Sequence, residues 1–182
     1  MEWLKDNYAI IIANDFARSF LIIISAILIA KITDLIFIGF FKKITSRTDT
    51  KLDDEIVTLF HRPIFYSILF IGFSMAVKTA SLPDYIDFAL VGIFKTATII
   101  IWLFLISRIF IISIKWASKQ AENPLLQHKT LPLFNNLGKI AIGLFGIYFI
   151  FLSWNINING ILASAGVLGV VLGLAAKDTV AN

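Results

Sequence analysis

Long, uninterrupted apolar stretches are the feature of this sequence that most restricts its fold. Five of them occupy residues 19–41, 63–80, 88–117, 133–154 and 160–182. An α-helix needs about 20 apolar residues to cross the roughly 30 Å hydrocarbon core of a bilayer. Soluble domains are about 45–50% apolar and about 25% charged, whereas this chain of 182 residues is 58% hydrophobic and 15% charged. The sequence therefore predicts an all-α integral membrane protein with about five transmembrane helices.

Breaks between the apolar stretches predict three regions. Residues 1–18 mix apolar and charged side chains and suggest an interfacial segment. Residues 19–154 hold four helices rich in Phe, Ile and Leu that suit lipid, and residues 155–182 hold a helix of different composition. The turn at residues 81–84 and the break at residues 155–160 separate neighbouring helices, and Pro63 is placed in the first turn of its helix. The N-terminus lacks the basic region of a signal peptide, so the first helix is expected to remain in the mature chain.

Lysine and arginine residues concentrate in the loops after the first and third apolar stretches. Such loops are usually cytoplasmic. This distribution predicts a multi-pass protein of the cell (inner or plasma) membrane, with its N-terminus outside and its C-terminus in the cytoplasm. The net charge of +4 then reflects topology, and no nucleic-acid partner is expected.

Residues for catalysis or metal binding do not form recognisable patterns. The chain has no cysteine, and His61 and His128 lie at no metal-ligand spacing. The acidic run at residues 53–55 is better explained as the first turn of a helix than as a cation site. We therefore expect no enzyme activity, no metal and no cofactor.

Four charged residues lie inside the apolar stretches, where charge is costly and often functional. They are Lys31, Asp34, Lys95 and Arg108. Lys31 and Asp34 are three residues apart on one helix face and can form an ion pair. Salt bridges between helices are the favoured interpretation. The alternative is a small ion-coupled secondary transporter that uses Lys31 and Asp34 as its relay.

Small residues recur every three or four positions along the last apolar stretch. They are Gly160, Ala163, Gly166, Gly169, Gly173 and Ala176. Such a stripe lets helix backbones approach closely in lipid, and a single contact within one subunit would also explain it. The remaining surface carries Val167, Val170, Val171 and Leu174 without any aromatic residue, although the chain holds 17 Phe. This helix is therefore expected to be shielded from lipid, as a pore-lining helix in a ring would be.

The run from Leu162 to Asn182 resembles the pore helix of the small-conductance mechanosensitive channel (MscS) family. Residues 48–55 resemble the cytoplasmic loop of members with extra N-terminal helices. The resemblance implies a homoheptamer among membrane lipids, with seven copies of the last helix around a pore. It implies a channel that membrane tension opens to release ions and small osmolytes on hypo-osmotic shock.

The resemblance also assigns roles to individual positions of the pore helix. It implies that a glycine face of each pore helix packs against a partner face of the neighbouring helix. The glycine face consists of Gly166, Gly169 and Gly173, and the partner face consists of Ala163, Val167 and Val171. Valine at two positions where the family has alanine is expected to hold neighbouring helices further apart. Val170 and Leu174 match the two apolar rings that form the gate. Lys177 and Asp178 match the region where the family's pore helix bends, and Asp178 occupies the position of the family's glycine.

The sequence stops at Asn182, inside the helix that family members continue into a cytoplasmic β-rich domain. We therefore expect this chain to be a piece of a longer channel, cut after the first part of the pore helix. A scaffold subunit without conduction of its own is a third possibility.

Overall fold

A computed structural model of the chain describes residues 14–45, 51–120 and 131–180, and every regular element within these ranges is an α-helix. In chain order the helices are α2 (Asp15–Thr45), α3 (Lys51–Thr79), α4 (Asp84–Gln120), α5 (Leu131–Ser153) and α6 (Asn159–Val180). The predicted all-α fold is confirmed. The predicted interfacial segment falls mostly on residues 1–13, outside the described ranges.

Four of the helices are long and apolar enough to cross a membrane. Their candidate spans are Asp15–Gly39, Leu59–Thr79, Asp84–Trp116 and Leu131–Ser153. Helix α6 contributes a shorter apolar stretch, Asn159–Ala175. The chain is thus a multi-pass membrane protein, and the crossing by its last helix remains a prediction.

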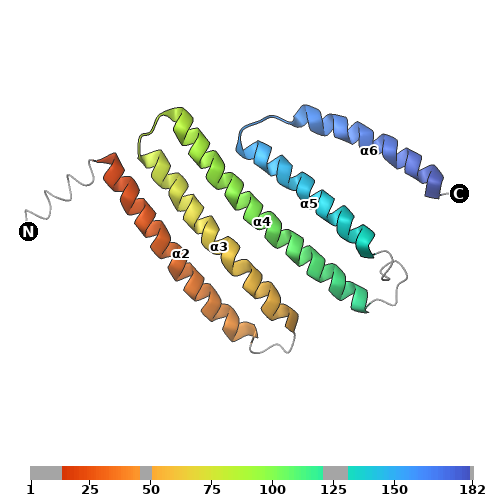
Figure 1. Ribbon diagram of the computed structural model, residues 1–182, viewed down its shortest axis with the longest axis horizontal. Helices are drawn as coiled ribbons and strands as arrows, with labels where there is room; N and C mark the ends of the chain where they lie inside the picture. The colour runs from red at the N-terminus through yellow and green to blue at the C-terminus, as the bar shows by residue number, and fades with distance from the viewer. Residues whose placement is uncertain (1–13, 46–50, 121–130, 181–182) are drawn as a thin grey trace, which may run out of the picture.

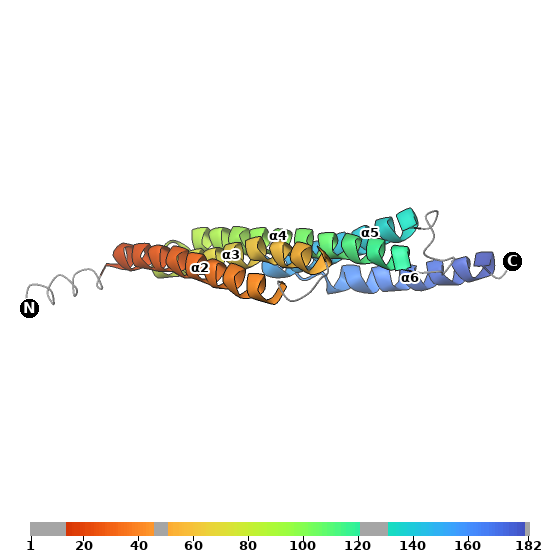
Figure 2. The same ribbon diagram turned by 90° about the horizontal axis from the view of Figure 1, so that it is seen from below.

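The four long helices lie side by side in chain order, and α6 diverges from them (Figure 1). Seen from below, this layer is only one helix thick (Figure 2). Each helix of the layer packs on the next, and none of these three extensive contacts includes α6. No large side chain in the described ranges is fully buried. The buried residues that the structure describes are few and mostly small, so the apolar faces of the layer are largely uncovered within the described part of the chain.

The closest helix contact, between α2 and α3, is built from small residues. Ala26 and Ala30 of α2 and Ala76 of α3 are buried, with Ala30 0% exposed. Gly72 lies so close to Ala26 that a Cβ on Gly72 would overlap the Cβ of Ala26. Both helices thus present small residues at a spacing of four, the pattern that lets membrane helices approach closely.

All five described helices begin earlier than their apolar stretches predict, and the difference is largest for α3. Helix α2 begins at Asp15 rather than Ser19, because helix formation does not require apolar residues and an acidic residue suits a first turn. Helix α3 begins at Lys51, so Pro63 lies inside it and not in its first turn as predicted. Proline in a helix interior removes one backbone hydrogen bond, and membrane helices tolerate this where neighbouring groups compensate. The acidic run at residues 53–55 does fall in the first turn of α3.

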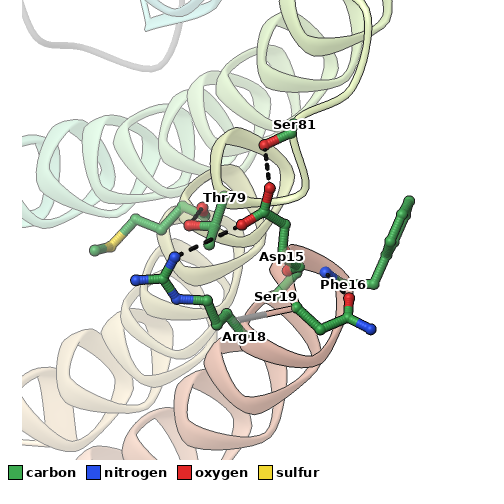
Figure 3. Close-up of polar contacts among 8 residues, drawn as sticks. Asp15, Phe16, Arg18, Ser19, Thr79 and Ser81 are labelled. Atoms are coloured by element: carbon green, nitrogen blue, oxygen red, sulfur yellow. Dashed lines mark hydrogen bonds and ion pairs between the residues drawn. The ribbon is translucent and has the colours of Figure 1, made fainter. Parts of the chain in front are cut away.

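The turn between α3 and α4 is tied to the beginning of α2. Ser81 adopts a left-handed backbone conformation (φ 51°) and donates a hydrogen bond of 2.6 Å from Oγ to Oδ2 of Asp15. Figure 3 shows Asp15 between Ser81 and Arg18, whose Nη1 lies 3.6 Å from Oδ1 of Asp15. One carboxylate therefore joins α2 to a turn 66 residues further along the chain.

Candidate functional site

The chain reverses direction between α5 and α6 through a helix-capping motif. Asn155 is left-handed (φ 55°), and its N–H donates to the carbonyl of Leu152 at 3.1 Å. The N–H of Ile156 donates to the carbonyl of Phe151 at 2.9 Å. This pair of bonds is a Schellman motif, in which asparagine is the usual substitute for glycine. Asn157 Oδ1 then accepts from the backbone N–H of Asn159, where α6 begins.

Helix α6 presents its apolar side chains to its surroundings. Every side chain of α6 that the structure describes is exposed. Val167, Val170, Val171 and Leu174 are between 57% and 65% exposed. An apolar groove of about 570 Å³, lined by Leu144, Phe145 and Tyr148 of α5 and by Leu162, lies between α5 and the beginning of α6. The faces of α6 beyond this groove are thus not used for packing within the subunit.

The glycines of α6 differ from those of the layer. A Cβ added to Gly166, Gly169 or Gly173 would meet no atom within 4 Å. The same atom on Gly138 or Gly146 of α5 would run into Phe110 or Leu103 of α4. Gly138 and Gly146 of α5 therefore serve contacts with α4. Gly166, Gly169 and Gly173 of α6 make no such contact with the part of the chain that the structure describes.

The residues of α6 to which the family resemblance gives roles lie in three directions around the helix axis. We call Gly166, Gly169 and Gly173 the glycine face, Ala163, Val167 and Val171 the valine face, and Val170 and Leu174, which the resemblance matches to a gate, the gate positions. At about 100° per residue, the glycine and valine faces are centred about 125° apart around the helix axis. The gate positions point into the angle between these two faces. The helix remains regular through Lys177, which is exposed, and Asp178, whose side chain is outside what the structure describes.

Of the four charged residues inside the apolar stretches, Asp34 contacts another helix and does not pair with Lys31. Asp34 of α2 forms a hydrogen-bonded contact through Oδ1 with Nδ1 of His61 on α3, and not with Lys31. Lys31 is exposed and forms no ion pair with any residue in the described ranges. Lys95 and Arg108 of α4 are also exposed without such a pair. Asp34 therefore contacts a residue of the neighbouring helix α3, and the pairing with Lys31 that the sequence allowed is not found among the side chains that the structure describes.

Two tryptophans form hydrogen bonds between helices that the sequence reading missed. Nε1 of Trp102 donates to Oγ of Ser67 at 2.9 Å, joining α4 to α3. Nε1 of Trp154 donates to Oγ1 of Thr96 at 2.9 Å, joining the end of α5 to α4. An indole N–H inside a membrane requires an acceptor. The presence of tryptophan in an apolar stretch therefore predicts a hydrogen bond, but it does not predict which hydroxyl group accepts it.

Neither histidine lies in a metal-binding cluster as far as the structure describes them. His61 contacts Asp34 alone among acidic residues, and no group of three metal-ligating side chains occurs in the described ranges. His128 lies outside those ranges, as do the side chains of residues 53–55.

Comparisons with known proteins bear on α5 and α6 directly. The family model described as "Mechanosensitive ion channel, transmembrane helices 2/3" matches residues 136–177. An uncharacterized MscS family protein of Aquifex aeolicus is 27% identical over 192 residues, covering 96% of this chain and 46% of the relative. The small-conductance mechanosensitive channel MscMJ of Methanocaldococcus jannaschii is 32% identical over 163 residues. The match covers 86% of this chain and 45% of that relative. The chain thus spans about half the length of these relatives. No solved structure matches it.

Proposed function

The chain belongs to the MscS family of mechanosensitive ion channels, and from this premise we propose that it forms the membrane part of a tension-gated, homo-oligomeric channel lined by α6. The family is one of channels and not of enzymes. The observation that carries the proposal is the exposure of both the glycine and the valine face of α6, which pack against nothing in the part of the chain that the structure describes. In a ring of subunits, the glycine face of each α6 packs against the valine face of the α6 next to it.

The angle between the two faces suits a closed ring. In a ring of seven, the directions from one helix to its two neighbours differ by about 129°, and rings of six or eight give about 120° and 135°. The angle of about 125° between the faces of α6 falls within this range. Seven is the number that the family resemblance implies. The gate positions would then point toward the axis of the ring, because they lie inside the angle between the neighbours.

Gating follows from the chemistry of the gate positions. Rings of Val170 and Leu174 make a narrow apolar throat from which water withdraws, so that ions cannot keep their hydration. Membrane tension favours the conformation with the larger area in the membrane plane, a population shift. Helices α2–α5 lie in lipid and respond to tension, and the open channel passes ions and small osmolytes on hypo-osmotic shock. Positive-inside counting places this channel in the cell membrane with its N-terminus outside.

Serine substitution at the gate tests this proposal. The Val170→Ser variant of the full-length channel should hydrate the throat, so that openings occur at lower tension or without tension. Patch-clamp recording at defined pipette suction measures this threshold. Leu168→Ser is the matched control: it removes an equally exposed apolar side chain of α6 (62% against 64%) from the far side of the helix. Unchanged thresholds in Val170→Ser, or an equal change in both variants, would remove Val170 from the gate.

A further inference from the structure

An open groove of about 390 Å³ runs between α3 and α4, and two lysines lie at its edge. Its apolar lining includes Phe70 and Ile71 of α3 and Phe94 and Ile99 of α4, and its lysines are Lys78 and Lys95. The hydroxyl of Ser74 in the same lining donates to the carbonyl of Phe70 in its own helix. The groove is therefore apolar along its length and cationic at its edge.

Neither lysine has a counter-ion among the side chains that the structure describes. Lys78 and Lys95 are exposed and form no ion pair with a carboxylate in the described ranges. The acidic residue tied into the nearby turn, Asp15, is already engaged by Arg18 and Ser81. Two like charges at one groove repel each other, and an anion between them removes this repulsion.

Lys78 lies at the end of the layer where lipid head groups are expected, and Lys95 lies further along α4, within its candidate span. Lys78 is in the last turn of α3. Lys95 is level with the end of α5, because Trp154, just beyond α5, donates its indole N–H to Thr96. Tryptophan concentrates at the membrane–water interface, and lysine side chains extend along apolar surface to bring their charge to that level.

We propose that this groove binds one anionic phospholipid, whose phosphate lies between Lys78 and Lys95 and whose acyl chain lies against Phe70, Ile71 and Ile99. Among the molecules of a membrane, an anionic phospholipid joins a negative head group to an apolar chain, as this groove requires. The site lies in the layer and away from α6, and the inference does not depend on channel activity.

Native mass spectrometry of the full-length protein in detergent tests the site, with phosphatidylglycerol as the anionic probe and phosphatidylcholine as the zwitterionic one. The wild-type protein should retain one phosphatidylglycerol per subunit more tightly than phosphatidylcholine. The variant Lys78→Gln/Lys95→Gln should bind phosphatidylglycerol about tenfold more weakly, because two phosphate contacts are lost. Its binding of phosphatidylcholine should not change.

Two further variants separate the site from general charge and from head-group binding alone. Lys31→Gln/Lys139→Gln removes the same charge from exposed positions outside the groove and should bind phosphatidylglycerol as the wild type does. Ile71→Trp narrows the groove and keeps both lysines, and it should also weaken phosphatidylglycerol binding. The proposal is overturned by unchanged binding in Lys78→Gln/Lys95→Gln, or by an equal loss in the control pair. A change of oligomeric state with lipid binding retained would instead assign the lysines to a contact between subunits.

Discussion

Single positions decide how closely the membrane helices approach each other. Gly72 and Ala26 bring the backbones of α2 and α3 together, and Ala30 is completely buried between them. In lipid no hydrophobic force draws helices together, so close backbone packing supplies much of their attraction. Asn155 acts at the other end of the chain, where its left-handed conformation turns α6 away from the layer.

The variant Gly72→Ala tests the contact between α2 and α3. The added Cβ would overlap the Cβ of Ala26, which cannot rotate away, so we expect a loss of about 1–3 kcal/mol in stability. Thermal unfolding in detergent measures the change. Gly143→Ala in α5 is the control, because its Cβ meets nothing within 4 Å. It should gain up to about 1 kcal/mol from better helix propensity. A neutral Gly72→Ala variant would contradict the tight packing of these helices.

The helices of the chain are of two kinds. In α5, two of the three glycines are covered by side chains of α4: Phe110 lies over Gly138 and Leu103 over Gly146, and Gly143 is open. In α6, glycines at similar spacing are open, and the valines beside them are exposed. The same residue type therefore packs within the subunit in one helix and is available to other subunits in the next.

Substitution of Gly169 tests the glycine face as a surface between subunits. Gly169→Leu should leave the fold of the subunit intact, since no atom of the chain lies near the added side chain. It should disrupt assembly, because a leucine separates helix backbones that must approach closely. Native mass spectrometry reports the oligomer, and circular dichroism reports the helices. Gly143→Leu, at an equally open glycine of α5, is the control. Normal assembly and gating of Gly169→Leu would exclude this face from the contact between subunits.

At the scale of the whole molecule, the described part of the chain is a one-helix-thick layer of α2–α5 from which α6 diverges (Figures 1 and 2). Such a subunit exposes apolar surface on both sides of the layer, and we expect lipid to cover α2–α5 and neighbouring subunits to cover α6. Across the layer, polar contacts join consecutive helices: Asp34 with His61, and Trp102 with Ser67. These contacts fix the order of the layer and do not form a continuous path through it.

Neutralising Asp34 separates a channel from the carrier alternative. Asp34→Asn weakens the contact with His61, so stability should fall by about 1 kcal/mol and the tension threshold should shift. Conduction should remain. A carrier that used Asp34 as its relay would lose substrate-coupled flux, measured in proteoliposomes with an imposed proton gradient. Lys31→Gln is the control: Lys31 has no ion pair in the described ranges, so its removal should change neither property.

The sequence alone predicted an all-helical membrane fold and the approximate extent of its helices, because hydropathy and the helical period are local properties of the chain. It could not determine partners. Asp34 meets His61, 27 residues away, and not Lys31, three residues away, because contact depends on which helix faces come together. Only the tertiary structure decided that Gly138 and Gly146 of α5 are covered by side chains of α4, whereas Gly143 of α5 and the glycines of α6 are left open by the described residues. The physical reason is that a stripe of small residues permits close approach and does not specify which helix will approach.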